Sequence, residues 1–292
     1  MEKRIYAKQD ELTLKKIHAV LMIIAKEIKR ICEKNNIHYF MLAGTQLGAV
    51  RHKGFIPWDD DMDLGMLRDD YDKFLEVCKT DLDHEHFLVQ NFDTEPGFGK
   101  FYTRIILKNT SLTYDYIKNV NTTKGFFVDV FPYENTPKSK ILQKKQCMIM
   151  SFALRIVKEK TGYTHKCRTL GGKIQILFKD FFTLDFVKNL YIKEMKRYNN
   201  KPTELINSAN AGYGYFNEIL KKKWVMNVEQ MQFEDITLPG IKDYDEYLTS
   251  LYGDYMKIPD EDDRVTHEFN EIDFGPYDNI LDENIIKNWE GK

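Results

Sequence analysis

The segment Trp58-Asp-Asp-Asp-Met-Asp-Leu-Gly65 decides how this chain is expected to fold. Asp59, Asp61 and Asp63 occupy alternate positions, and alternate side chains of an extended strand share one face. Carboxylates that lie so close together repel one another unless a cation lies among them. Because oxygen ligands favour Mg2+, Mn2+ or Ca2+ over zinc, the segment predicts a strand that binds a divalent cation.

Two other structures present acidic residues at such density. An EF-hand loop that began at Asp59 would need Gly at its sixth position and Glu at its twelfth, where the chain has Leu64 and Asp70. A solvated acidic loop is the second alternative. The interleaved apolar residues Met62, Leu64 and Met66 favour a strand over that loop.

The segment before the acids, Gly44-Thr-Gln-Leu-Gly-Ala-Val-Arg-His-Lys-Gly54, combines small residues with three potential cations. Gly44 and Thr45 are predicted at a turn from a strand into a helix, where backbone N–H groups suit a phosphate. Arg51, His52 and Lys53 are candidate phosphate ligands, although each taken singly is more often a surface residue. Together with the acids, the segment indicates metal-assisted phosphoryl transfer.

A further carboxylate for such a site usually comes from a distant strand. Asp129, in Phe126-Phe-Val-Asp-Val-Phe-Pro132, is the candidate, because an unpaired charge inside an apolar strand is costly. The alternative places Asp129 at a solvated edge of that strand.

Composition places the chain among globular proteins of a reducing compartment. It has 292 residues, of which 42% are hydrophobic and 30% charged, and its four cysteines include no CxxC pair. The N-terminus lacks the apolar core of a signal peptide, and no stretch approaches the roughly 20 apolar residues of a membrane span. These features predict a cytoplasmic protein.

The net charge of -2 hides a basic block. Residues 138–201 carry 16 Lys and Arg against 4 Asp and Glu, a net charge of +12. Such a block is a candidate for contact with an anionic surface, and a solvated helical face is the alternative.

The apolar periodicity predicts a mixed α/β (α+β) sheet with helices packed on it. Helices are expected at 10–34, 44–48 and 68–79, and strands at 37–42, 61–66, 87–91, 101–107, 112–116 and 126–131. Residues 140–198 read as a helical insert broken at Gly162 and Gly171. After residue 210 the chain is turn-rich and acidic. The predicted division is 1–137 for a catalytic core, 138–201 for the basic insert and 202–292 for a part that completes the core.

Four phenylalanines of the insert are expected to form its core. The alternative is an edge that touches a membrane. These residues are Phe178, Phe181, Phe182 and Phe186.

The order of these motifs resembles the LicD family of phosphotransferases, whose animal relatives include fukutin and the fukutin-related protein. The likeness is dense from 37 to 74, and it includes Arg68-Asp-Asp-Tyr-Asp-Lys-Phe74. It continues at Phe127-Val-Asp-Val-Phe-Pro132 and at Leu251-Tyr-Gly-Asp-Tyr-Met-Lys-Ile-Pro259, but no motif matches in 138–201. Two residues depart mildly from the family pattern, Gln46 where an apolar residue is usual and Tyr133 where Leu is frequent.

The resemblance implies a nucleotidyltransferase-like fold and a metal-dependent transfer of phosphocholine. The donor would be CDP-choline, the acceptor a sugar hydroxyl of a teichoic acid, lipooligosaccharide or similar surface glycan, and CMP the second product. By position, Asp61 and Asp63 would be paired ligands of Mg2+ or Mn2+ and Asp129 the third, with Asp59 beside or behind them. Asp129 would also be one group able to take up the hydroxyl proton.

The donor site would be completed by residues of the upstream motif. Gly44 and Thr45 match the phosphate-binding turn of the fold. Arg51 and His52 match a motif of the family, and Lys53 follows them. A nucleotidyl- or polyol-phosphate transferase of the same fold and a catalytically inactive binding protein stay open as alternatives.

The expected partners follow from this chemistry. They are a CDP-activated donor and a lipid-linked glycan acceptor, with no nucleic acid. The basic block 138–201 would contact the anionic inner face of the cell membrane, which would bring a cytoplasmic chain to a lipid-bound substrate.

Overall fold

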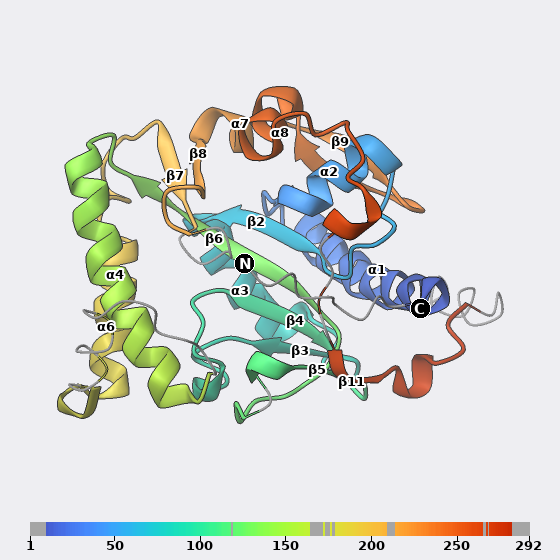
Figure 1. The fold of residues 1–292 in the computed structure, drawn as a ribbon, viewed down its shortest axis with the longest axis horizontal. Coiled ribbons are helices and arrows are strands. Elements are labelled where there is room, and N and C mark those ends of the chain that lie inside the picture. The colour runs from blue at the N-terminus through green and yellow to red at the C-terminus, as the bar shows by residue number, and fades with distance from the viewer. Residues whose placement is uncertain are drawn as a thin grey trace.

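The computed structural model describes residues 10–117, 119–163, 172, 176, 179–208, 214–264, 267 and 269–281. Its central sheet has the strand order β1-β2-β6-β4-β3, with β7 and β8 added beyond one end of β6. Only β2 and β6 pair in parallel among these strands, and the sheet is therefore mixed (Figure 1). The mixed α/β architecture predicted from the sequence is confirmed. The strands are β1 (Phe40–Met41), β2 (Asp63–Leu67), β3 (Phe87–Gln90), β4 (Thr103–Leu107), β6 (Phe127–Thr136), β7 (Leu205–Asn207) and β8 (Ile219–Lys221).

Helices α1 (Glu11–Lys34) and α3 (Arg68–Asp81) pack against the sheet. Asp10 caps α1, since its carboxylate accepts the Thr13 N–H at 2.8 Å. The predicted apolar stripe of α1 is buried at every position from Leu14 to Ile31. At about 25 cal/mol per Å2, burying such a stripe is the main source of stability for a helix of this kind.

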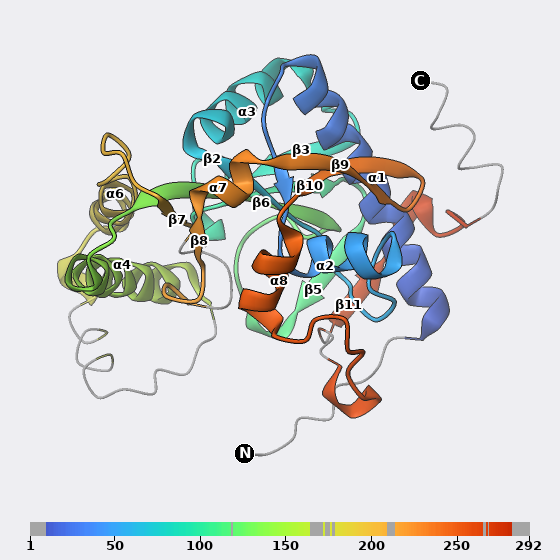
Figure 2. The ribbon, with the colours of Figure 1, turned by 90° about the horizontal axis from the view of Figure 1, so that it is seen from above.

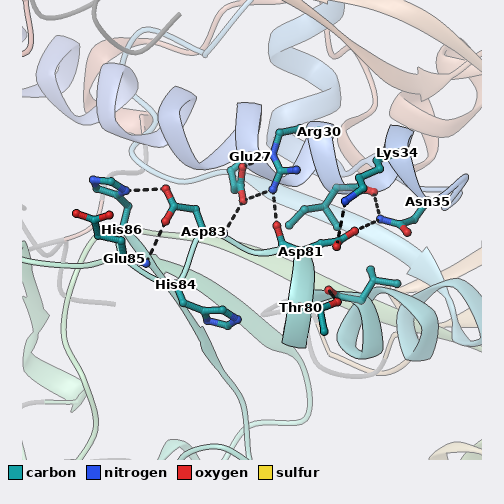
Figure 3. Close-up of polar contacts among 12 residues, drawn as sticks. Glu27, Arg30, Lys34, Asn35, Thr80, Asp81, Asp83, His84, Glu85 and His86 are labelled. Carbon is teal, nitrogen blue, oxygen red and sulfur yellow. Dashed lines mark hydrogen bonds and ion pairs between the residues drawn. The ribbon is translucent and has the colours of Figure 1, made fainter. Parts of the chain in front are cut away.

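A polar cluster joins the end of α1 to the connection between α3 and β3 (Figure 3). Glu27 pairs with Arg30 and also accepts the Asp83 N–H at 3.0 Å. The Asp81 carboxylate pairs with Lys34 Nζ at 3.1 Å and accepts a hydrogen bond from the Asn35 side-chain amide at 2.9 Å. These contacts fix α1 relative to α3 and to the connection from α3 to β3.

The basic insert forms a helical hairpin of α4 (Lys140–Thr161) and α6 (Leu184–Met195), with a 3-10 turn at Lys179–Phe181 (Figure 1). Gly162 ends α4 with a φ of 85°, which confirms the predicted break there. The hairpin attaches to the core through stacked rings, since Phe101 lies 3.7 Å from Tyr191 between ring centres.

The expectation that four phenylalanines form the core of the insert is wrong for two of them. Phe181 is 80% exposed and Phe186 is 51% exposed. Phe182 is half-buried, and Phe178 lies outside the described residues. The core is built instead from Met150, Ala153, Ile156, Val157, Val187, Tyr191 and Met195.

The C-terminal part is more ordered than its turn-rich composition predicts. It contains a hairpin of β9 (Val228–Phe233) and β10 (Ile236–Ile241). The sequence did not predict this hairpin, because Glu229, Gln230 and Gln232 of β9 are polar and exposed and therefore give no apolar pattern. The other elements are α7 (Lys222–Met226), α8 (Tyr244–Tyr252), and β11 (Phe269–Asp273), which pairs with β5 (Ser111–Tyr114). Short 3-10 turns lie at Pro96–Phe98, Asp115–Ile117, Glu261–Asp263 and Gly275–Tyr277.

Helix α2 (Ala43–His52) is enclosed by this C-terminal part, with α8 and the β9–β10 hairpin packed against it (Figure 2). Gln46, fully buried, accepts the Ile241 N–H at 2.8 Å. Its polar side chain therefore ties α2 to β10, which gives a structural reason for an amide at this position. Residues after 202 thus complete the surroundings of α2, the helix that precedes the acidic segment.

Candidate functional site

Asp63 and Asp129 are neighbours across the parallel pair β2–β6. The two residues are directly registered, and paired residues on adjacent strands project to the same face of a sheet. Asp129 is 7% exposed, so it does not lie at a solvated strand edge. Loss of hydration, followed by the charges of Asp61, Asp129 and Asp59, raises the pKa of Asp63 well above its ordinary value.

Asp59 and Asp61 join this pair from the connection that precedes β2. The predicted strand begins only at Asp63, so 59–62 are not part of the sheet. The segment is held by the His18 ring, whose Nε2 lies 2.8 Å from the Asp59 carbonyl oxygen. Desolvation and neighbouring carboxylates raise the pKa of Asp59 well above its ordinary value and that of Asp61 to about 6.

Asp60, the remaining acid of the run, binds His267. Its Oδ2 accepts the His267 N–H at 3.0 Å, and its Oδ1 lies 2.7 Å from Nδ1. The hydrogen bond to Asp60 raises the pKa of His267 to about 9. Ligand atoms of Asp60, Asp61 and His267 lie close enough to share one ion. Sequence analysis did not identify His267, because nothing in its local sequence marks it.

Arg104 is the second residue that sequence analysis missed. Its Nε donates to Asp129 Oδ1 at 2.9 Å, and its guanidinium carbon lies 3.5 Å from the centre of the Phe127 ring. Arg104 is 5% exposed and is registered opposite Asp129 on β4. The signal was present, because Arg104 is a lone charge in an apolar strand, as Asp129 is.

Lys100 is a second basic side chain near the acids. Its Nζ donates to the Tyr102 hydroxyl at 2.6 Å and faces the rings of Phe98 and Tyr163. Desolvation, with the positive charge of Arg104, lowers the pKa of Lys100 well below its ordinary value, while Asp129 opposes the shift. Arg104 therefore brings positive charge to one border of the acidic group, and Lys100 places a second basic nitrogen near Arg104.

Gly44 and Thr45 hold the acids in place from the start of α2. The Thr45 hydroxyl oxygen accepts the Asp63 N–H at 2.9 Å. A Cβ added to Gly44 would lie 2.8 Å from Asp59 Oδ2, so only glycine lets the helix approach this carboxylate. Their predicted contact with a donor phosphate stays a prediction.

Arg51, His52 and Lys53 lie at the other end of α2, about 10 Å from Gly44 along the helix axis. Arg51 donates to His52 Nε2 at 2.9 Å and to the Tyr255 carbonyl at 2.8 Å. Lys53 is exposed and caps the helix with a φ of 63°. The structure thus shows Arg51 fixing the 255–257 segment, and the predicted contact of the three cations with the donor remains untested.

The chemistry of the four carboxylates suits a hard divalent cation. Asp59, Asp61, Asp63 and Asp129 supply only carboxylate oxygens, and their mutual repulsion is relieved most directly by a dication. Asp129 Oδ2 makes no hydrogen bond to any residue within the described ranges. The donor set therefore fits Mg2+ or Mn2+ better than zinc or copper.

We expect Gly44→Ala to reduce activity about tenfold or more while leaving the free energy of unfolding within about 1 kcal/mol of wild type. The new methyl group displaces Asp59, whereas alanine favours the helix. Gly48→Ala is the contrast, because its Cβ would lie 2.4 Å from the Gly54 carbonyl oxygen. That change should instead destabilise the fold by about 1–3 kcal/mol. Urea unfolding with initial rates separates the two; equal activity losses at equal stability would contradict the assignment.

Comparison with known proteins agrees with this geometry. Residues 36–161 match the family described as LicD/FKTN/FKRP, nucleotidyltransferase domain. The chain is 31% identical over 268 residues to the lipopolysaccharide cholinephosphotransferase LicD of Haemophilus influenzae, covering 89% of this chain and 98% of that relative. An uncharacterized protein of Rickettsia typhi is 44% identical over 54 residues, 18% of either chain. One of Rickettsia prowazekii is 49% identical over 47 residues, 16% of this chain and 18% of that one.

Proposed function

This chain belongs to the LicD family, and on that premise we propose that it transfers phosphocholine from CDP-choline to a sugar hydroxyl of a cell-surface glycan, releasing CMP. Support comes from the relative of Haemophilus influenzae, which is named a lipopolysaccharide cholinephosphotransferase. Its match with this chain covers nearly the whole length of both proteins. The observation that carries the proposal is the registration of Asp63 beside Asp129, together with the charges of Asp59 and Asp61, which act on Asp63 from the preceding connection.

In this proposal Asp61, Asp63 and Asp129 hold Mg2+ or Mn2+, and Asp59 supports them from the connection before β2. When bound, the ion would neutralise the donor's diphosphate and polarise the phosphorus. The remaining tasks belong to the protein side chains. Arg104 bonds to Asp129 and its positive charge also acts on Asp63, so it suits charge that develops on the departing CMP.

The proposed step exchanges one phosphorus–oxygen bond for another. The acceptor hydroxyl oxygen attacks the phosphorus of phosphocholine, and the bond from that phosphorus to the CMP oxygen breaks with its electron pair. The hydroxyl proton passes to a carboxylate, for which Asp129 Oδ2 is available beside the bond from Oδ1 to Arg104. Arg104 would keep the Asp129 carboxylate oriented during this transfer.

A donor screen tests the proposal. The protein is incubated with CDP-choline, CDP-ribitol, CDP-glycerol or CTP, each with Mg2+ and a lipooligosaccharide-derived acceptor. We expect CMP release from CDP-choline alone, dependent on both acceptor and divalent ion. Release of CMP only from the polyol donors, or of pyrophosphate from CTP, would replace the proposal by one of the other transferases of this fold.

We also propose a cytoplasmic location, where the donor would be available. No helix in the part of the chain that the structure describes has the length and apolarity to cross a bilayer. The lipid-linked acceptor would then have to be reached from the membrane surface.

A further inference from the structure

The outward face of α4 mixes large apolar side chains with lysines. Ile141 is 79% exposed and Met148 is 65% exposed, and Lys144 and Lys145 lie between them. These positions recur every three or four residues, which places them on one side of the helix. The opposite side buries Gln143, Gln146, Met150, Ala153, Ile156 and Val157 against the rest of the protein.

Aromatic side chains extend this face to the start of α6. The Phe182 ring packs edge-on against Phe152 of α4 at 5.4 Å and stacks with Phe186 at 5.6 Å. Phe181, in the 3-10 turn, is 80% exposed beside them. Both views show α4 and α6 side by side at the edge of the molecule farthest from α1 (Figures 1 and 2). The exposed residues of α4, the turn and α6 are called the α4–α6 face below.

Exposed apolar side chains are concentrated on the α4–α6 hairpin. Among the described residues, eleven large apolar side chains are exposed, and five of them belong to this hairpin: Ile141, Leu142, Met148, Phe181 and Phe186. Apolar side chains scattered singly on a surface need no partner, but a contiguous patch with a polar border marks an interaction site.

The positive charge of the α4–α6 face indicates which kind of partner it binds. The block 138–201 carries a net charge of +12, and Lys144 and Lys145 form no ion pair with any described residue. A second copy of this chain would oppose the same positive charge and would be repelled. A soluble polyanion would attract the lysines but would leave the phenylalanines in water. An anionic bilayer satisfies both groups, because phosphates lie above an apolar layer.

We propose that the α4–α6 face binds the surface of an anionic lipid bilayer, with Phe181 and Phe186 inserted among the headgroups and Lys144 and Lys145 on the lipid phosphates. The inference rests on exposure and charge and is independent of the transfer reaction. Of the whole block 138–201, only the α4–α6 face would contact the membrane. Lys188 and Lys196 would not bind lipid phosphates, because they pair with Asp93 and Asp72.

Flotation of the full chain with vesicles tests the proposal. Vesicles of phosphatidylcholine with 30 mol % phosphatidylglycerol, an amount on the order of that in anionic leaflets, are compared with pure phosphatidylcholine. We expect binding to the anionic vesicles alone, weakened by salt. Lys144→Gln with Lys145→Gln should weaken partitioning about 25-fold, from about fivefold for each lysine at the surface. Phe181→Ser with Phe186→Ser should weaken it at least about tenfold.

A matched control replaces two apolar residues of similar exposure outside the face, Leu12→Ser with Met226→Ser, each of which is 58% exposed in wild type. This control should bind as wild type does. All variants change exposed side chains, and thermal melting verifies that each is folded. CMP release with a soluble acceptor, measured in parallel, should be the same for all, so that failure of the transfer proposal is recognised separately.

Three outcomes would overturn the inference. The first is no flotation with anionic vesicles at low salt. The second is equal flotation of wild type and both face variants. The third is a wild-type dimer in sedimentation equilibrium that becomes monomeric in the phenylalanine variant, which would assign the face to a second copy.

Discussion

Replacing Asp63 with Asn is expected to lower the rate of phosphocholine transfer by about 10²–10³-fold or more while raising the stability of the metal-free protein by about 1 kcal/mol. Activity falls because a ligand of the proposed ion loses its charge. Stability rises because Asp61, Asp129 and Asp59 repel the Asp63 carboxylate, as its raised pKa indicates. Asparagine has the same shape, and the backbone bond from Asp63 N–H to Thr45 is retained.

Melting temperatures in EDTA and in Mg2+ measure both effects. Wild type should melt higher with Mg2+, because a ligand that binds only the folded state stabilises it, and the variant should lose that shift. Asp69→Asn is the matched control, since it removes the same charge from an exposed position on α3. A variant that is less stable than wild type in EDTA, or that keeps the full Mg2+ shift, would contradict the proposed ion site.

Arg104→Met is expected to destabilise the protein by about 3–5 kcal/mol and to remove most activity. Arg104 and Asp129 form a buried pair, and removal of the cation leaves the Asp129 carboxylate beside Asp63 without its compensating charge. The long apolar side chain of Met keeps contact with the Phe127 ring, so the loss reports the charge more than the packing.

A double variant separates stability from chemistry. Arg104→Met with Asp129→Leu removes the whole pair, and it should regain most of the lost stability while activity stays absent. Urea unfolding of the four proteins of this cycle gives the coupling free energy. If Arg104→Met were as stable as wild type, Arg104 would have no part in holding Asp129. If the double variant were active, Asp129 would have no part in the transfer.

Most of the fold could be predicted from the sequence because its periodic patterns are strong. The stripe of α1 and the helix α3 lie within a few residues of the predicted bounds, and Gly162 ends α4 as expected. The strand at Asp63 was predicted two residues early, because alternation of Asp59 and Asp61 looks the same in a strand and in an extended connection. The β9–β10 hairpin escaped because its strand β9 is largely solvated and polar.

The site divides in the same way. A dense run of acids and a lone Asp in an apolar strand each carry a local electrostatic cost, so the sequence alone singled out Asp59, Asp61, Asp63 and Asp129. Arg104 is likewise a lone charge in an apolar strand, but its neighbours in the sequence do not indicate which acid it would pair with. His267 had no local signal, since its place beside Asp60 depends on a contact between residues that are 207 positions apart in the chain.

The sequence by itself determined the family, the α/β class and the identity of the acids, because periodicity and uncompensated charge are properties of short segments. Only the tertiary structure decided that Asp63 and Asp129 are neighbours, that Arg51 binds a backbone segment, and that Phe181 and Phe186 face solvent. The reason is physical: strand register and the burial of a side chain depend on which distant surfaces pack together, and that choice minimises the free energy of the whole chain.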